Sequence, residues 1–333
     1  MIQSTSKSSK RPWVKAASYL LGHRAAGLFL FICLLIISVT SINPAFLKIQ
    51  NLRDLAVQAA PVCIISCGVM LVMVTGEIDI SVGSMMGVLA ASMGVMISTS
   101  RGQLPPQIVI PTTLFIGLFI GLLNGWLVAY VGVPSIIVTL GMLTALRGIT
   151  ELIMGGSWIT DLPDSIRFLG TGNFAGIPIS IWTAGFVILL SSWLIHRTSI
   201  GRRIFAVGSN PQAAILAGLP TKSIKIFVFA WTGLLTAMAT LISVPQLSVV
   251  DSGIGMGVEL LVITCVVVGG TSVSGGLGNL SGVLFGVGLM TMISTVLIFM
   301  KLGENATYWS RAIQGVFILG AILADHWISR QKK

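Results

Sequence analysis

The polar stretch Arg197-Thr-Ser-Ile-Gly-Arg-Arg-Ile-Phe-Ala-Val-Gly-Ser-Asn-Pro-Gln-Ala-Ala-Ile-Leu-Ala-Gly-Leu-Pro-Thr-Lys222 interrupts a chain that is otherwise largely apolar. It predicts a short helix over 211–217, with sequence signals for a helix start and a helix end. Asn210 is a good N-cap, Pro211 suits the first helical position, and Gly218 can end the helix in a left-handed conformation. Isolated helices shorter than ~12–15 residues are marginal in water. The segment therefore either docks on a partner or is a surface loop with a frayed turn, and spacing alone favours neither.

The composition excludes an ordinary soluble domain. Hydrophobic residues make up 54% of the chain and charged residues only 9%, whereas soluble domains carry about 25% charged residues. A membrane-spanning helix needs roughly 20 apolar residues. The sequence predicts an all-α polytopic membrane protein, and the eighth span is short enough to indicate a broken or re-entrant element. About ten spans are expected, at 25–43, 55–75, 82–99, 108–130, 134–154, 177–195, 224–244, 257–270, 277–299 and 310–328.

The net charge of +10 follows from topology. If both termini lie inside, thirteen of the 20 Lys and Arg residues are cytoplasmic, which is the positive-inside pattern. We therefore expect a basic cytoplasmic segment (1–24), a transmembrane domain (25–328) with a cytoplasmic loop at 196–223, and a cytoplasmic tail (329–333). No cleavage site follows the first apolar stretch, so we expect it to be retained. Lipid is the expected surrounding, with no nucleic-acid partner.

Few residues in the chain are suited to catalysis or metal binding. The four cysteines fall within predicted spans with no histidine at ligand spacing, so no metal site is predicted. The glycine-rich stretch 269–278 lacks the Gly-Lys-Ser/Thr of a nucleotide P-loop, and the dipeptide Gly-Lys occurs nowhere in the chain. We interpret that stretch as a flexible link between the eighth and ninth spans. The chain is not expected to be an enzyme.

Two groups of charged residues lie between or within apolar runs. Glu77 and Asp79 follow the second span, where Asp79 or Ser81 can cap the next helix. Arg147 and Glu151 lie four apart on one helical face, so they can pair or can lie on a solute path.

Glycines recur at every fourth position in two spans. Such a stripe lets another helix approach closely. The stripes also suggest that spans two to five and seven to ten form an inverted repeat, an arrangement common in transporters. The residues are Gly117, Gly121 and Gly125 in the fourth span, and Gly278, Gly282 and Gly286 in the ninth.

Four segments resemble one family, the membrane permeases of binding-protein-dependent ABC importers. Gln212-Ala-Ala-Ile-Leu-Ala-Gly218 resembles the Glu-Ala-Ala-xxx-Gly signature of their cytoplasmic loop, with Gln replacing Glu. Gly76-Glu-Ile-Asp-Ile-Ser-Val-Gly-Ser84 resembles the Gly-Gly-Ile-Asp-Leu-Ser-Val-Gly-Ser fingerprint of the monosaccharide branch, which includes ribose, xylose, galactose and autoinducer-2 importers. Residues 133–149 and 269–278 resemble the same branch.

The resemblance implies a permease that moves a monosaccharide or sugar-like solute across the bacterial inner membrane by alternating access. A separate ATPase subunit would hold ATP and Mg, so this chain would bind no cofactor itself. The implied partners are that ATPase, an external substrate-binding protein, and a second permease copy or paralogue. The implied coupling residues are Asn210, Pro211, Gln212, Ala213, Ala214 and Gly218, and the fingerprint or gate residues are Glu77, Asp79, Ser81 and Gly83.

Two other functions remain open. A permease for branched-chain amino acids would have the same kind of cytoplasmic coupling loop, although the fingerprint at 76–84 favours sugars. An ion-coupled secondary transporter is the second alternative. It would need titratable groups deep in the membrane, and the predicted spans hold few besides Arg147 and Glu151.

Overall fold

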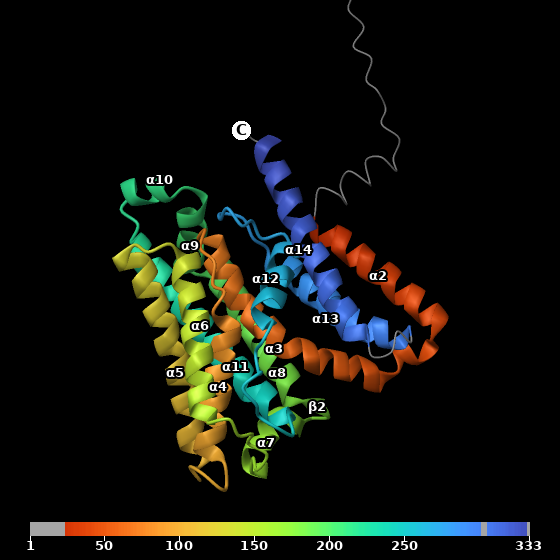
Figure 1. Cartoon of the computed structure of the whole chain (residues 1–333). Helices are drawn as coiled ribbons and strands as arrows, with labels where there is room; N and C mark the ends of the chain where they lie inside the picture. Colours follow the sequence, from red (N-terminus) through yellow and green to blue (C-terminus); the bar gives the residue numbers. More distant parts are fainter. Residues whose placement is uncertain (1–23, 301–304, 332–333) are drawn as a thin grey trace, which may run out of the picture.

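The computed structural model describes residues 24–300 and 305–331, and it is built almost entirely of helices (Figure 1). Each of the ten predicted apolar stretches overlaps a helix. The elements are α2 (Arg24–Ile42), η1 (Pro44–Leu47), α3 (Ile49–Val74), α4 (Val82–Ile97), α5 (Pro106–Trp126), η2 (Leu127–Val131), α6 (Ser135–Met154), α7 (Asp164–Thr171), β1 (Asn173–Phe174), β2 (Ile177–Pro178), α8 (Ile179–Arg197), α9 (Ser199–Ser209), α10 (Pro211–Leu216), α11 (Thr221–Ser243), η3 (Val244–Gln246), α12 (Val258–Val268), α13 (Leu280–Phe299) and α14 (Ala306–Gln331).

Six helical segments among the described residues are long and apolar enough to cross a membrane. Three further helices are equally apolar but shorter, and two of these, α4 and α12, have only 16 and 11 residues. The predicted polytopic all-α class is therefore confirmed. The predicted short eighth element is α12. Residues 1–23 of the predicted N-terminal segment and 332–333 of the predicted tail lie outside the described residues.

Helix α3 forms the centre of the bundle. Every residue from Ile64 to Thr75 is buried, and α3 packs against α8, α11, α12 and α13. Helix α2 lies against α13 on one side, while α4, α5 and α6 lie on the other (Figure 1). An all-round apolar surface is what a buried central helix requires.

The glycine stripes bring pairs of helices into backbone contact, as predicted. A Cβ on Gly117 or Gly121 of α5 would lie 2.6 Å and 2.4 Å from carbonyl oxygens of α11. A Cβ on Gly282 or Gly286 of α13 would lie 2.1 Å and 2.2 Å from carbonyl oxygens at Gly269 and Cys265 of α12 and its end. Because the two stripes meet non-equivalent partners, they do not by themselves indicate a repeat.

The segment between α6 and α8 is folded, although the sequence indicated only a loop. It contains α7 and the hairpin β1–β2, at the end of the bundle opposite α10 (Figure 1). Asp161 anchors it to the α4–α5 loop by accepting hydrogen bonds from the Ser98 and Thr99 hydroxyls and the Ser100 backbone. Donors on Ser100, Ser98 and Thr99 hold the pKa of the Asp161 carboxyl well below its usual range.

Gly121→Ala should destabilise the bundle, because the new methyl group meets the Phe229 carbonyl and the Ala230 backbone at 2.4 Å and 3.0 Å. Neither atom is on a flexible side chain, so α5 and α11 must separate, at an expected cost of about 1–3 kcal/mol. Thermal unfolding in detergent measures this as a lower midpoint. Gly148→Ala on α6 is the control, since nothing lies within 4 Å of the added carbon. Equal midpoints for the two variants would contradict the close-packing account.

Candidate functional site

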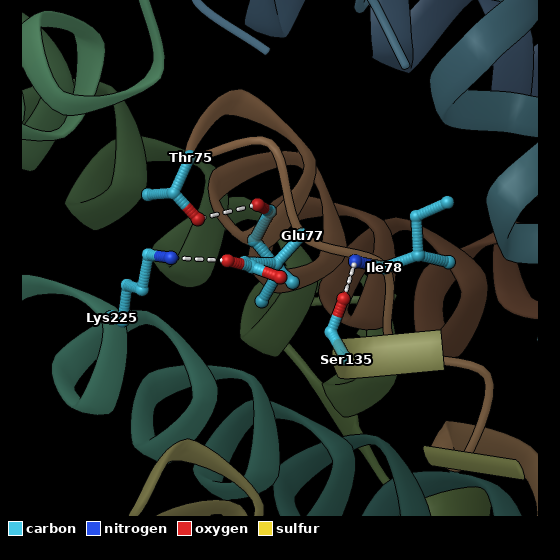
Figure 2. Close-up of polar contacts among 6 residues, drawn as sticks. Thr75, Glu77, Ile78, Ser135 and Lys225 are labelled. Carbon is cyan, nitrogen blue, oxygen red and sulfur yellow. Dashed lines mark hydrogen bonds and ion pairs between the residues drawn. The ribbon is translucent and has the colours of Figure 1, made fainter. Parts of the chain in front are cut away.

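The non-helical link 75–81 joins α3 to α4 and carries the acidic fingerprint (Figure 2). Glu77 forms an ion pair with Lys225 in the second turn of α11, and both side chains are largely buried, at 14% and 26% exposed. Thr75 donates from its hydroxyl to the Val72 carbonyl, which closes the end of α3. The link is therefore tied to α11 by opposite charges, a contact that the sequence did not predict.

The first two turns of α6 hold the middle of the link. The backbone N–H of Ile78 donates to the Ser135 hydroxyl at 3.1 Å, and the Ile78 carbonyl accepts from Thr139 at 3.3 Å (Figure 2 shows the former). Both backbone groups of this half-buried residue are thus satisfied by side chains of another helix. Such pairing is required wherever a chain leaves helical geometry away from water.

Asp79 and Ser81 were predicted as alternative caps of α4, and neither caps it. Asp79 instead accepts from the Ser81 backbone at 2.9 Å and from the Ser81 hydroxyl at 2.6 Å. Asn124 of α5 donates to that same hydroxyl at 2.9 Å. All three side chains are fully buried. The carboxylate therefore shapes the turn before α4, because its oxygen accepts from Ser81, the residue immediately before the helix begins.

Gly83 lies where two helix starts meet. A Cβ here would lie 1.9 Å from Oε2 of Glu259 and 2.5 Å from the carbonyl of Gly255. Gly255 belongs to the link 244–257, which leads into α12. The first turn of α4 thus touches the start of α12. Glycine is needed at position 83 because a side chain would occupy the space of the opposing backbone.

The short helix α10 has the end signals that the sequence predicted. The Asn210 side chain accepts from the Ala213 backbone at 2.9 Å, and Pro211 occupies the first turn. Gly218 has φ of 73°, and Leu219 N–H donates to the Ala214 carbonyl at 3.0 Å. Helix α10 ends at Leu216, one residue before the predicted boundary.

Helix α9 was missed by the sequence analysis, and it ties α10 to the bundle. Thr198 caps its start by accepting from Gly201 N–H at 3.1 Å. At its end, a Cβ on Gly208 would lie 1.7 Å from the Val74 carbonyl. Buried Ile204, Val207 and Gly208 follow helical spacing, a signal that the sequence did contain.

The glycine-rich stretch 269–279 is not the flexible link that we expected. Gly276 N–H donates to the Val74 carbonyl at 2.8 Å, and a Cβ on Gly276 would lie 2.7 Å from Cα of Ser209. The stretch is docked on the ends of α3 and α9. Its glycines allow three backbone segments to meet, which explains their number without a phosphate-binding role.

The predicted pair of Arg147 and Glu151 is not formed. Arg147 Nη1 donates to the backbone carbonyls of Ser252 and Ile254, at 2.9 Å and 3.0 Å, while Glu151 is exposed. The guanidinium reaches inward to the non-helical link before α12, where unpaired carbonyls are better partners than an exposed carboxylate.

Known proteins are similar to this chain over most of its length. A family described as "Branched-chain amino acid transport system / permease component" matches residues 51–322. The ribose import permease protein RbsC of Haemophilus influenzae is 36% identical over 91% of this chain and 94% of its own length. The autoinducer 2 import system permease protein LsrC of Klebsiella pneumoniae is 34% identical over 92% of this chain and 87% of its own length.

The chain belongs to this permease family.

Membership in the family places the link 75–81, the docked stretch 269–279 and helices α9 and α10 in a transport protein. In the permease these parts form one connected region. Helix α10 is joined to α9, the end of α9 contacts Val74, and the next residues of the chain lead to Glu77 and its partner Lys225. Backbone contacts therefore connect α9 to the end of α3, directly before the link 75–81.

Removing one charge of the Glu77–Lys225 pair should destabilise the permease, since each side chain is largely buried. Glu77→Gln and Lys225→Met should each cost roughly 1–3 kcal/mol, because a buried charged group loses its partner. The double variant should cost less than the sum of the two single variants. Thermal unfolding of the four proteins gives the coupling.

The control is Lys222→Met, one turn earlier on α11. Its ammonium lies 5.1 Å from the centre of the Tyr130 ring, a contact expected to contribute no more than about 1 kcal/mol at an exposed site. Strictly additive effects of the Glu77 and Lys225 substitutions would show that the pair does not hold the link.

Proposed function

We propose that this permease is the membrane-spanning subunit of an ATP-driven bacterial importer for a monosaccharide or a similar sugar-like solute. The observation that carries this proposal is α10, a two-turn helix that is fixed at both ends yet presents Ile215 and Leu216 to the surface, at 61% and 89% exposed. Exposed apolar side chains on a short, capped helix suit docking on another protein. The groove of a separate ATPase subunit is the proposed partner.

The named relatives favour a sugar-like solute. Their names specify import of ribose and of autoinducer 2, whereas only the broad family description mentions branched-chain amino acids. An ion-coupled mechanism has less support, because such a mechanism needs titratable groups deep in the membrane. Arg147 donates to two backbone carbonyls and Glu151 is exposed. ATP and Mg would be bound by the ATPase and not by this chain.

The transport cycle would use the connected region described above. Closure of two ATPase subunits would move α10 and α9, and the contact of Gly208 with Val74 would pass that motion to the link 75–81. The Glu77–Lys225 pair spans α11 and this link, so its making or breaking would accompany a change between inward-open and outward-open states. Glu77, Asp79, Ser81 and Gly83 would thus act in gating, and residues 210–218 in coupling.

We further propose that the permease has ten spans in two inverted repeats, α3–α6 and α11–α14. Helices α4 and α12 would be equivalent, since each is short and each follows a non-helical link. The first turn of α4 meets the link before α12 at Gly83 and Gly255, which suits inverted repeats that meet near the membrane centre. A substrate-binding protein would dock at the end of the bundle that carries α7 and β1–β2. A second permease copy or paralogue would complete the path.

The termini and α10 should lie in the cytoplasm, given the distribution of Lys and Arg. In a variant without native cysteines, an impermeant thiol reagent applied to intact spheroplasts should label Ser165→Cys on α7 and leave Ala217→Cys beside α10 unlabelled. Both positions are exposed, so access alone separates them. Permeabilised cells provide the control, in which both positions should react. Labelling of position 217 but not 165 in intact spheroplasts would reverse the topology.

Gly218→Val should impair coupling while leaving the bundle intact. Gly218 has φ of 73° and nothing within 4 Å of an added Cβ, so the substitution acts through backbone strain, which is of order 1–2 kcal/mol. That strain is large for a helix of six residues. Solute uptake and co-purification of the ATPase should both fall at matched permease levels, and Gln212→Ala should be milder because it keeps the helix.

The matched control is Gly176→Val in the β1–β2 turn, where φ is 78° and the space is also open. It imposes similar strain at the opposite end of the bundle and should keep the ATPase bound. If Gly218→Val retained its ATPase and transported like the parent, α10 would not be the coupling element.

A further inference from the structure

A hollow of about 630 Å³ lies between the last turn of α8, one face of α9 and the start of α13, at the end of the bundle that carries α10 (Figure 1). Ile195 and His196 line it from α8, and residues 278–280 line it from the start of α13. Arg202 and Phe205 line it from α9, where their spacing of three residues places them on one face. Neither the coupling helix nor the acidic link contributes to its walls.

The walls of this hollow carry positive charge and no acidic side chain. The contributing segments, 195–205 and 278–280, contain three arginines and no Asp or Glu. Arg202 is exposed, and in the part of the chain that the structure describes no ion pair or hydrogen bond uses its guanidinium. His196 Nδ1 lies 2.9 Å from the Ser192 carbonyl. Since a carbonyl only accepts, Nδ1 carries the hydrogen and Nε2 is left for the hollow.

The start of α13 adds hydrogen-bond donors to the same hollow. Asn279 Oδ1 accepts from the Ser281 backbone and hydroxyl, at 3.1 Å and 2.9 Å, and no described residue accepts from the Asn279 amide nitrogen. The N-terminus of a helix carries partial positive charge and N–H groups without intrahelical partners. An arginine, an amide and a helix start thus converge as donors, and this combination suits a phosphate group.

The hollow lies where the apolar part of a membrane-spanning helix ends. Helix α8 is long and apolar enough to cross a membrane, and its apolar run stops at Ile195, directly before His196. Trp193, in the same turn, is 58% exposed, and tryptophan favours the level of the lipid headgroups. The hollow is therefore placed at the boundary between hydrocarbon and headgroups.

An exposed apolar stripe leads along α8 to this hollow. Phe186 and Leu189 are 60% and 72% exposed, and Trp193 and His196 are the next exposed residues at helical spacing. Residues three and four apart lie on one face of a helix. A single molecule with an apolar chain and a phosphate could lie on this face, with the chain on Phe186 and Leu189 and the phosphate beside His196.

We propose that this hollow binds the phosphodiester group of an anionic phospholipid, whose acyl chains lie along the exposed stripe of α8. Arg202 forms a two-pronged contact with the phosphate, a geometry that guanidinium allows and ammonium does not. Asn279 donates to a further phosphate oxygen. The lipid joins α8, α9 and α13 at the level of the headgroups, so it fixes α9, which leads into α10. The proposal goes beyond the proposed function and does not depend on the solute.

Lipid selectivity is measured by native mass spectrometry of the full-length permease in detergent, titrated with phosphatidylglycerol or phosphatidylethanolamine carrying the same acyl chains. The parent should bind phosphatidylglycerol more tightly, because the ammonium of phosphatidylethanolamine offsets its own phosphate. Arg202→Gln should lower the affinity for phosphatidylglycerol about tenfold, since a charged hydrogen-bond donor is lost. Arg202→Lys should recover part of that loss, because lysine keeps the charge but not the two-pronged geometry.

The matched control is Arg203→Gln, which removes the same charge from the neighbouring position of α9. Arg203 is exposed but does not line the hollow, so its loss should lower the affinity less than Arg202→Gln does. Equal losses for the two variants would show attraction to diffuse surface charge and would overturn the proposal. Equal affinity of the parent for the two lipids would overturn it without any variant.

Two further measurements distinguish other sources of negative charge. Glycerophosphoglycerol, which is the same headgroup without acyl chains, should not displace the lipid at equal concentration. Displacement would identify a site for soluble phosphate esters instead of lipid. If Arg202→Gln kept the lipid preference but lost the ATPase on co-purification, Arg202 would contact an acidic surface of that subunit and the proposal would fail. None of these assays involves solute uptake, so each of these failures leaves the proposed function standing.

Discussion

Every backbone N–H and C=O inside a membrane must find a partner within the protein, and two of the links between helices of this permease illustrate that requirement. The link 75–81 obtains its partners from Ser135 and Thr139 of α6. The link 244–257 obtains two from Arg147, also on α6. Helix α6 therefore supports both interruptions, one near each end. A charge that looks out of place in an apolar helix is explained by two carbonyls that would otherwise lack partners.

The helices of this protein were predictable because they depend on local composition. Apolar runs of the right length predicted the helical stretches, and the signals around Asn210, Pro211 and Gly218 predicted α10. The partners in the site were not predictable. Glu77 and Lys225 are 148 residues apart, and Arg147 and Ile254 are 107 apart. At position 147 the local rule of pairing four residues along a helix competed with a distant backbone acceptor, and the backbone acceptor won.

The glycines show the same division between local and distant information. Their spacing predicted smooth faces on α5 and α13, and these faces do meet other backbones. The spacing could not say which backbones, because a smooth face fits several. The stretch 269–279 was misjudged for this reason, since glycine suits both a flexible link and close backbone contact. In the structure the stretch makes close backbone contact with Val74 and Ser209, and φ is positive at Gly270, Gly275 and Gly276.

The interactions at the link 75–81 differ in how readily their groups can change hydrogen-bond partners. At its start, the Gly276 N–H to Val74 carbonyl bond and the Gly208 contact join backbone to backbone, so these segments must move together. Further along, Glu77, Ser135 and Asn124 use side chains, each of which can change partner by rotating. A typical hydrogen bond contributes only about 0.5–1.5 kcal/mol net. The contacts of α9 and of the stretch 269–279 with Val74 are therefore fixed by the backbone, whereas the contacts from Glu77 onward depend on side-chain rotamers. Those pairings join the link 75–81 to α5, α6 and α11.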